Sequence, residues 1–245
     1  MREARQANEL REVRVSPGFN RWAEGSALVE WGDNKVLATV SVDPRLPQHL
    51  RGRGAKAGGW LTAEYSLLPR STHDRSPRER LYSGGRTQEI QRLIGRALRN
   101  VVNLQLFPNK TLIVDVDVIQ ADGGTRCAGI LAGYAALHNA ANGFIFRGEI
   151  DEWPLRFELG AVSVGVIGGE RYVDLQYSED VRADVDLNVV ATGDGRVVEV
   201  QGGSEQAPLD AEEYVSLVAL GVKATEKLLE RVRPQLDGGV PSAVG

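Results

Sequence analysis

The amino-acid sequence predicts an α+β fold, in which helices pack on sheets without a strict alternation of strand and helix. Three observations support this prediction. Strand-like segments fill the first 67 positions, a long helical pattern begins only at position 86, and four more strand patterns follow before a final helix. At 245 residues the chain is long enough to bury a sizeable core, and we expect residues 1–236 to form a single domain.

The N-terminal part of the chain has the pattern of strands joined by turns and loops. Four strands are expected, at residues 13–15, 26–31, 35–42 and 60–68. Gly32-Asp33-Asn34 stands between two of these β-rich runs and is typical of a hairpin turn. Residues 44–59 and 69–85 have no apolar period, and arginine is frequent in both, so we expect loops there.

Two helices are predicted in the middle of the chain, with one strand between them. From Arg86 to Val102 apolar residues recur at the i, i+3, i+4 and i+7 spacing of a helix with one buried face. Residues 111–119 alternate aspartate with valine and isoleucine, which predicts a strand with one polar face. A second helix should follow Gly123-Gly124, and the small residues along it favour close packing.

The second half of the chain again has strands followed by a helix. The expected strands are residues 159–167, 171–175, 185–191 and 197–201. A closing helix is expected at residues 210–233, because acidic residues just after Asp210 favour the positive end of the helix dipole. The last residues, 237–245, are expected to be a disordered tail.

Charge and cysteine content narrow the classes of protein that fit. The formal net charge is −4, yet the segment from Arg45 to Arg86 carries nine basic residues against three acidic ones. A basic segment on an acidic protein is typical of a chain that binds a polyanion at one part of its surface. The single cysteine, Cys127, excludes an internal disulfide. Neither a secretion signal nor a membrane-spanning run is recognisable, so we expect a cytoplasmic protein with no membrane partner.

Two glycine pairs, each followed by an arginine, are the most informative motif. Gly84-Gly85-Arg86 and Gly123-Gly124-Thr125-Arg126 both stand where a helix is expected to begin. A helix start offers unpaired N–H groups and partial positive charge, glycine lets a ligand approach the backbone, and arginine offers a fork for phosphate oxygens. If the two arginines converge in space, they would hold one phosphate from two sides.

An acidic cluster near position 180 is the candidate metal site. Asp184 and Asp186 would share a strand face if the strand begins as early as Asp184, and Asp180 would approach them from the preceding turn. Carboxylate oxygens suit Mg²⁺ or Mn²⁺ better than zinc, and the three histidines lack ligand spacing. An acid-rich turn is usually only solvated, so this pattern alone is a weak signal. Asp115 and Asp117 are expected to form a polar strand face more than further metal ligands.

Other enzyme classes lack their motifs. The sequence contains no Gly-x-Ser-x-Gly elbow, which disfavours a serine hydrolase of that type. It contains no glycine–lysine phosphate loop, which disfavours a P-loop NTPase.

Four separated motifs, in order along the chain, carry a resemblance to a known family. They are residues 59–70 (GWLTAEYSLLPR), 85–96 (GRTQEIQRLIGR), 117–126 (DVIQADGGTR), and 185–189 (VDLNV) with 199–202 (EVQG). In these motifs the chain resembles the bacterial ribonuclease PH family, over nearly its whole length. It departs from the family pattern in having Glu3-Ala4-Arg5 where Asp-Gly-Arg is usual, and in a longer loop before Gly59.

The resemblance implies a phosphorolytic 3′→5′ exoribonuclease. Such an enzyme trims the 3′ ends of transfer RNA precursors, and acts on other RNA with single-stranded 3′ ends, using inorganic phosphate as co-substrate. It releases nucleoside diphosphates and can run backwards to add nucleotides. The implied fold is the α+β ribonuclease PH domain, of the ribosomal protein S5 domain 2-like type. The implied assembly is a homohexameric ring, a trimer of dimers.

The resemblance also implies roles for particular residues. Phosphate would be bound by Arg86, Gly124, Thr125 and Arg126. Asp180 and Asp186 would be the catalytic carboxylates and would bind Mg²⁺ or Mn²⁺. RNA would be bound by the loop arginines Arg70, Arg75, Arg78 and Arg80.

Three alternatives to this interpretation stay open at the level of the sequence. A ring subunit without catalysis would keep the fold and the basic surface, although intact arginines and aspartates together disfavour it. A catalytic subunit of the archaeal exosome type would share the chemistry but depend on a partner chain. An RNA-binding scaffold would explain the basic loop, but not the two glycine–arginine helix starts.

Overall fold

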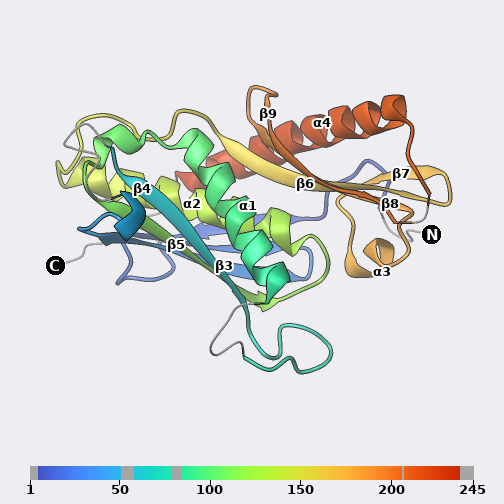
Figure 1. Ribbon diagram of the computed structural model, residues 1–245, viewed down its shortest axis with the longest axis horizontal. Helices are drawn as coiled ribbons and strands as arrows, with labels where there is room; N and C mark the ends of the chain where they lie inside the picture. The colour runs from blue at the N-terminus through green and yellow to red at the C-terminus, as the bar shows by residue number, and fades with distance from the viewer. Residues whose placement is uncertain (1–4, 51–57, 79–83, 206, 238–245) are drawn as a thin grey trace.

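The computed structural model describes residues 5–50, 58–78, 84–205 and 207–237, and the statements below concern these residues. Arg80 and the tail residues 238–245 lie outside them. Two sheets and the helices that pack on them confirm the α+β class (Figure 1). No helix in this part of the chain is long and apolar enough to cross a lipid bilayer.

The first sheet is formed by the N-terminal half and has the order β1-β2-β3-β5-β4. Its strands are β1 (Val13–Pro17), β2 (Gly25–Trp31), β3 (Asn34–Asp43), β4 (Trp60–Leu67) and β5 (Thr111–Gln120). Strands β1, β2, β3 and β5 pair antiparallel, with the expected tight turn between β2 and β3. β4 and β5 pair in parallel, because the chain crosses over between them through helix α1 (Gly85–Val101).

The second sheet is antiparallel and has the order β7-β6-β8-β9. Its strands are β6 (Leu159–Ile167), β7 (Glu170–Val173), β8 (Val185–Thr192) and β9 (Val197–Ser204). Helix α4 (Ala211–Leu236) packs along β6 and β8. Because both faces of β6 are covered, that strand is an almost unbroken apolar run.

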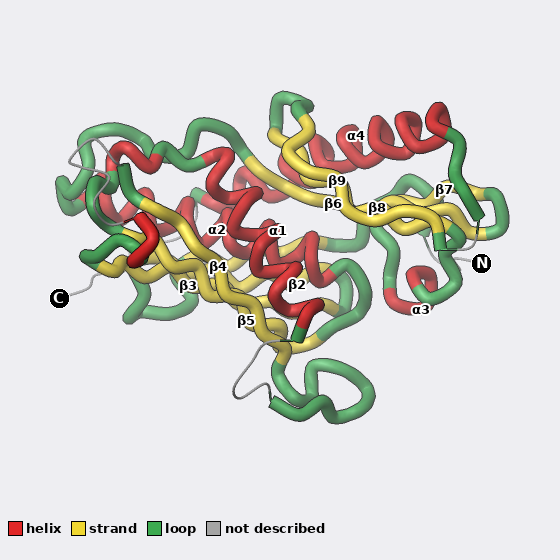
Figure 2. Tube along the Cα trace, viewed as in Figure 1, coloured by secondary structure: helices red, strands yellow, loops and turns green. Residues whose placement is uncertain are grey.

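Helix α2 (Thr125–Phe146) joins the two halves of the fold. It packs on β2 and β3 of the first sheet and on β6 of the second, and 16 of its 22 residues are buried. Such all-round burial explains its lack of a polar face. Figure 2 shows α1 and α2 between the strands of the first sheet and β6. One hydrophobic core therefore includes buried side chains from both halves of the chain.

The structure differs from the sequence prediction at a few element ends. β7 stops at Val173, short of the expected residue 175, because Asp174 has a positive φ of 57°. Residues 177–180 form a one-turn helix, α3 (Tyr177–Asp180), where only a turn was expected. α4 continues past Arg233 through Pro234, because the buried Leu236 side chain extends its packing face. Two short 3₁₀ helices, Gln48–Leu50 and Leu104–Leu106, were not foreseen.

Close contact between α2 and β2 makes Gly25 a sensitive position. A Cβ atom on Gly25 would lie 2.3 Å from the backbone nitrogen of Ala140 and 2.4 Å from the carbonyl oxygen of Ala136. Gly25→Ala should therefore lower the free energy of unfolding by about 2–3 kcal/mol, since backbone atoms must move apart.

Urea unfolding of Gly25→Ala and of a matched variant, Gly85→Ala, checks this. A Cβ at Gly85 meets no atom within 4 Å. Gly85 is the exposed first residue of α1, so that substitution should change stability by less than about 1 kcal/mol. Equal effects of the two substitutions would contradict the packing described for α2.

Candidate active site

One cavity of about 620 Å³ brings together the residues expected to bind phosphate and metal. It lies between the starts of α1 and α2, the loop before α2, helix α3 and strand β8. All six of the expected residues line it: Arg86, Gly124, Thr125, Arg126, Asp180 and Asp186. The fold thus gathers side chains that are separated by up to a hundred positions in the chain.

Arg86 and Arg126 occupy equivalent places at two helix starts. Each is the second residue of its helix, and neither helix has a side-chain cap or an acidic residue in its first turn. Within the described residues, neither guanidinium donates a hydrogen bond, and Arg126 has only a loose ion pair with Glu89 at 3.7 Å. Two arginine forks and two uncapped helix starts give the cavity the features of an anion site.

The glycine pair before α2 is required by its backbone conformation. Gly123 and Gly124 have φ values of 68° and 70°, which are strained for other residues. In addition, a Cβ on Gly123 would lie 2.5 Å from the backbone nitrogen of Tyr177. The absence of a side chain at Gly123 therefore lets α3, which carries Asp180, pack directly against the start of α2.

Asp180 and Asp186 face the arginines across the cavity. Burial raises the pKa of Asp186 to about 6, and the negative charge of Asp180 adds to this shift, while Arg126 opposes it. Burial also raises the pKa of Asp180, against the charges of Arg86 and Arg126. Glu205, which sequence reasoning missed, contributes further negative charge to both. Asp184 is turned elsewhere and accepts a hydrogen bond from the Gly168 amide at 3.0 Å.

Of the aspartates that line this cavity in the described residues, Asp180 and Asp186 are the pair whose charges interact with each other. In the described parts of the chain, no cluster of three or more His, Cys, Asp or Glu side chains is placed to hold one. Asp115 and Asp117 do not line the cavity; they lie half-buried on β5, where burial raises the pKa of each. They are a polar strand face, as the sequence favoured.

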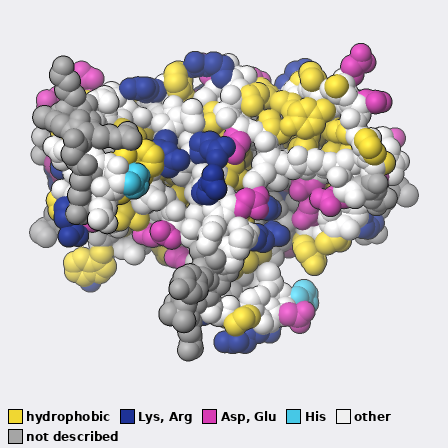
Figure 3. Space-filling view, viewed as in Figure 1, with side chains coloured by type: hydrophobic (Ala, Val, Ile, Leu, Met, Phe, Trp, Pro, Cys, Tyr) yellow, Lys and Arg dark blue, Asp and Glu magenta, His cyan; other side chains and the backbone are white. Residues whose placement is uncertain are grey.

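The basic loop stands beside the cavity, but its described arginines, Arg70, Arg75 and Arg78, do not line it. Thr72, His73, Asp74 and Ser76 form part of the cavity wall. Arg70, Arg75 and Arg78 belong to the same loop and are exposed to solvent, while Arg80 lies outside the described residues. Further basic side chains gather over α1 in the middle of the face drawn in Figure 3, where Arg92 and Arg96 are exposed.

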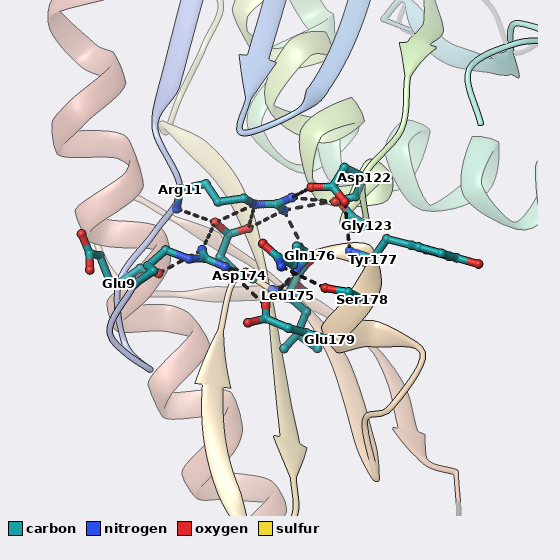
Figure 4. A network of polar contacts seen from close by, with 12 residues as sticks. Glu9, Arg11, Asp122, Gly123, Asp174, Leu175, Gln176, Tyr177, Ser178 and Glu179 are labelled. Carbon is teal, nitrogen blue, oxygen red and sulfur yellow. Dashed lines mark hydrogen bonds and ion pairs between the residues drawn. The ribbon is translucent and has the colours of Figure 1, made fainter. Parts of the chain in front are cut away.

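Arg11 and Asp174 form a buried ion pair next to the cavity, which sequence reasoning missed (Figure 4). The Arg11 guanidinium donates to Asp174 Oδ1 at 2.7 Å, and the Arg11 amide donates to Oδ2 at 2.7 Å. Trp31 Nε1 and Arg5 Nη1 also donate to Oδ2, at 3.0 and 2.8 Å. Burial alone would raise the pKa of Asp174, but the charge and hydrogen bonds of Arg11 more than offset this, so the pKa lies below its usual range.

The same guanidinium fixes the backbone on two sides of the cavity. It donates to the carbonyl oxygens of Asp122 at 2.6 Å, Gly123 at 3.3 Å and Leu175 at 3.3 Å. The Asn34 side chain assists, since its Nδ2 donates to the Gly123 carbonyl at 2.7 Å. The loop before α2 and the segment leading into α3 are thereby tied to one buried charge.

The Thr125 hydroxyl also has a partner that the sequence did not reveal. Tyr65 of β4 lies buried beneath the start of α2, and its hydroxyl is 3.1 Å from Thr125 Oγ1. Tyr65 belongs to the first of the four motifs and Thr125 to the third, so two motifs that are distant in the chain meet in the fold.

Comparison with known proteins decides the family. Residues 9–141 match the model of the 3′ exoribonuclease family, domain 1, and residues 159–224 match that of domain 2. The chain is 50% identical over 236 residues to ribonuclease PH of Deinococcus radiodurans, which covers 96% of this chain and 95% of that protein. The chain belongs to the ribonuclease PH family. This assignment confirms the activity expected from the motifs, a phosphorolytic 3′→5′ exoribonuclease.

Solved structures show the same fold at lower identity. A chain of the Archaeoglobus fulgidus exosome with RNA bound to the active site is 25% identical, with a TM-score of 0.76 over 93% of this chain and 90% of that one. Rice Rrp46 is 22% identical, with a TM-score of 0.74 over 95% of this chain and 98% of that one. The much higher identity to ribonuclease PH disfavours an archaeal exosome-type subunit.

The buried ion pair makes stability depend on pH in a definite direction. Because the folded pKa of Asp174 is depressed, its contribution is fully present above the unfolded value of about 3.9 and is lost as pH falls through the folded value. Asp174→Asn should lower the free energy of unfolding by about 3 kcal/mol at pH 7, since it leaves the buried Arg11 with only its longer ion pair to Asp122, at 3.3 Å.

Urea unfolding at pH 7, 5 and 3.5 measures this effect. The difference in free energy of unfolding between the parent protein and Asp174→Asn should be the same at pH 7 and pH 5 and smaller at pH 3.5. Asp151→Asn, at an exposed position, is the control and should leave stability unchanged at all three pH values. A gap that does not narrow in acid would show that the carboxylate charge is not what stabilises this network.

Proposed function

We propose that the 620 Å³ cavity is the active centre at which inorganic phosphate cleaves the last phosphodiester bond of an RNA chain. The observation that carries the proposal is the arrangement of charge in the cavity. Two arginine side chains without hydrogen-bond partners in the described residues share the cavity with two partly buried carboxylates. One side fits the attacking phosphate, and the other fits a cation bound to the phosphoryl group under attack.

In this mechanism Arg86, Arg126 and the N–H groups at the start of α2, around Gly124 and Thr125, hold inorganic phosphate. A phosphate oxygen attacks the terminal phosphorus in line, and the bond from that phosphorus to the 3′ oxygen of the preceding nucleotide breaks. The released 3′ oxygen takes up a proton, and the product is a nucleoside 5′-diphosphate. One ester is exchanged for one anhydride, so the reaction can also run backwards. Positioned positive charge stabilises the transition state.

We also propose that Asp180 and Asp186 bind Mg²⁺ or Mn²⁺. The carboxylates fit such an ion, because burial and mutual repulsion raise the pKa of Asp186 to about 6 and make a nearby cation favourable. Magnesium sites in enzymes acting on phosphates often use one or two carboxylates, with substrate oxygens completing the shell. A bound divalent cation would neutralise charge on the phosphoryl oxygens and the leaving 3′ oxygen.

The remaining features of the proposal concern RNA, assembly and location. Arg70, Arg75, Arg78 and Arg80 would bind the RNA backbone, with transfer RNA precursors as substrates. Residues 1–236 would act as one domain within a homohexamer, a trimer of dimers. Large exposed apolar side chains, including Trp22 and Phe146, supply surface for contacts between subunits. The cytoplasm is the proposed location.

Product analysis tests the proposed reaction directly. An RNA with a single-stranded 3′ tail is incubated with the protein and Mg²⁺, with and without inorganic phosphate. Nucleoside diphosphates should appear only when phosphate is present, because phosphate is the nucleophile. Monophosphates released without phosphate would indicate hydrolysis and overturn the proposal, and RNA binding without release would favour a non-catalytic subunit.

Substitutions on the two sides of the cavity should have different effects. Arg126→Ala should raise KM for phosphate about tenfold or more, since a charged hydrogen bond contributes about 1.5–3 kcal/mol. Asp186→Asn should lower kcat by more than about 100-fold, as expected when charge stabilisation is lost, while RNA still binds.

Steady-state kinetics at varied phosphate, together with RNA-binding titrations, separate these effects. Arg14→Ala is the control, because that arginine is exposed on β1 and does not line the cavity. Arg14→Ala should keep the parent values of KM for phosphate and of kcat. Near-normal turnover of Asp186→Asn would show that the carboxylates are wrongly assigned.

A further inference from the structure

The cavity has an apolar rim that the mechanism above does not use. Tyr177 and Val181 line the cavity, yet their side chains are 62% and 61% exposed. They are the large, exposed apolar side chains among the described residues that line it. In the described part of the chain, the Tyr177 ring has no aromatic or cation–π partner, and its hydroxyl has no hydrogen bond.

The backbone that carries Tyr177 is held firmly. Its amide donates to Asp122 Oδ1 at 3.3 Å and lies against the Cα atom of Gly123, where no side chain intervenes. The start of α3 is closed by a capping box between Gln176 and Glu179. Glu179 is itself buried and paired with Arg5. Because the backbone is already held, contact with a ligand would restrict only the side-chain rotation of Tyr177, and no backbone would have to be ordered.

The position of the ring relative to Asp180 identifies the part of the ligand it would meet. Tyr177, Asp180 and Val181 follow one another at i, i+3 and i+4, so they share one face of a helical turn. Figure 4 shows the Tyr177 side chain extending away from the Arg11 network. When the terminal phosphate group of RNA lies beside Asp180, the base of the same nucleotide is the nearest flat apolar group.

We propose that Tyr177, with Val181 beside it, forms the platform on which the 3′-terminal base of the RNA stacks. This inference rests on the proposed function, because it takes the RNA end to lie in this cavity. Stacking on an aromatic ring tolerates any base and contributes about 1–3 kcal/mol per base. The platform would therefore bind 3′ ends of any sequence while requiring that the terminal base be unpaired.

An RNA that lacks the terminal base isolates this contact. Two short single-stranded RNAs are compared, one intact and one with hydrogen in place of the 3′-terminal base. With the intact RNA, Tyr177→Ala should lower kcat/KM about tenfold, the loss expected for one base stack. With the abasic RNA it should change kcat/KM by less than about twofold, because the partner of the ring is already missing.

Companion variants distinguish stacking from other roles of the side chain. Tyr177→Phe should behave as the parent protein, since the ring is kept, and KM for phosphate should be unchanged in both variants. Tyr214→Ala is the matched control, because Tyr214 is partly exposed on α4 and does not line the cavity. Equilibrium binding of the two RNAs without phosphate repeats the comparison independently of turnover.

The outcomes separate this inference from the proposed function. Equal losses on both RNAs, or no loss on either, would overturn the platform while leaving phosphorolysis intact. A change in oligomeric state of Tyr177→Ala, without selective loss on the intact RNA, would show that the ring contacts another subunit instead. If the parent protein releases no diphosphate but binds the intact RNA more tightly through Tyr177, the platform stands and the proposed reaction fails.

Discussion

The proposed active site depends on a buried ion pair between residues 163 positions apart. Arg11 lies in the segment before β1, and Asp174 lies just after β7, so the pair joins the two halves of the chain. Around it the guanidinium binds three backbone carbonyls, which fixes the loop before α2 against the approach to α3. Removing one member of such a pair costs about 3–5 kcal/mol, because the other is left buried and charged.

This ion pair explains how the arginine side and the carboxylate side of the cavity keep fixed positions relative to each other. The proposed phosphate-binding side comes from the starts of α1 and α2, in the first half of the chain. The carboxylates come from α3 and β8, in the second half. Helix α2 packs against both sheets and supplies the apolar part of the connection. Gly123 allows the loop before α2 and the start of α3 to approach closely, since it has no side chain and the backbone of Tyr177 lies against it.

Much of this arrangement could be predicted from the sequence, because the relevant signals are local. Helical spacing after Arg86, alternation around Asp115 and the glycine pairs each occupy a short window. Arg11, Asn34 and Glu205 could not be recognised, since their roles depend on partners distant in the chain. The end of β7 was misplaced for the same reason, as Asp174 adopts a positive φ while its carboxylate binds Arg11. The RNA-binding role of the loop arginines stays a prediction, and nothing local indicated that Thr72, His73, Asp74 and Ser76 would form part of the cavity wall.

Native-state hydrogen exchange tests the central role of the Arg11–Asp174 pair most directly. In Arg11→Lys the charge is kept, but one ammonium group cannot reach the carboxylate and three carbonyls together. Amides of residues 123–128 and 175–181 should then exchange faster by a common factor, while those of β2 and β3 stay protected. Faster exchange in only one of the two segments would contradict the account, because it would show that the pair does not hold both sides of the site.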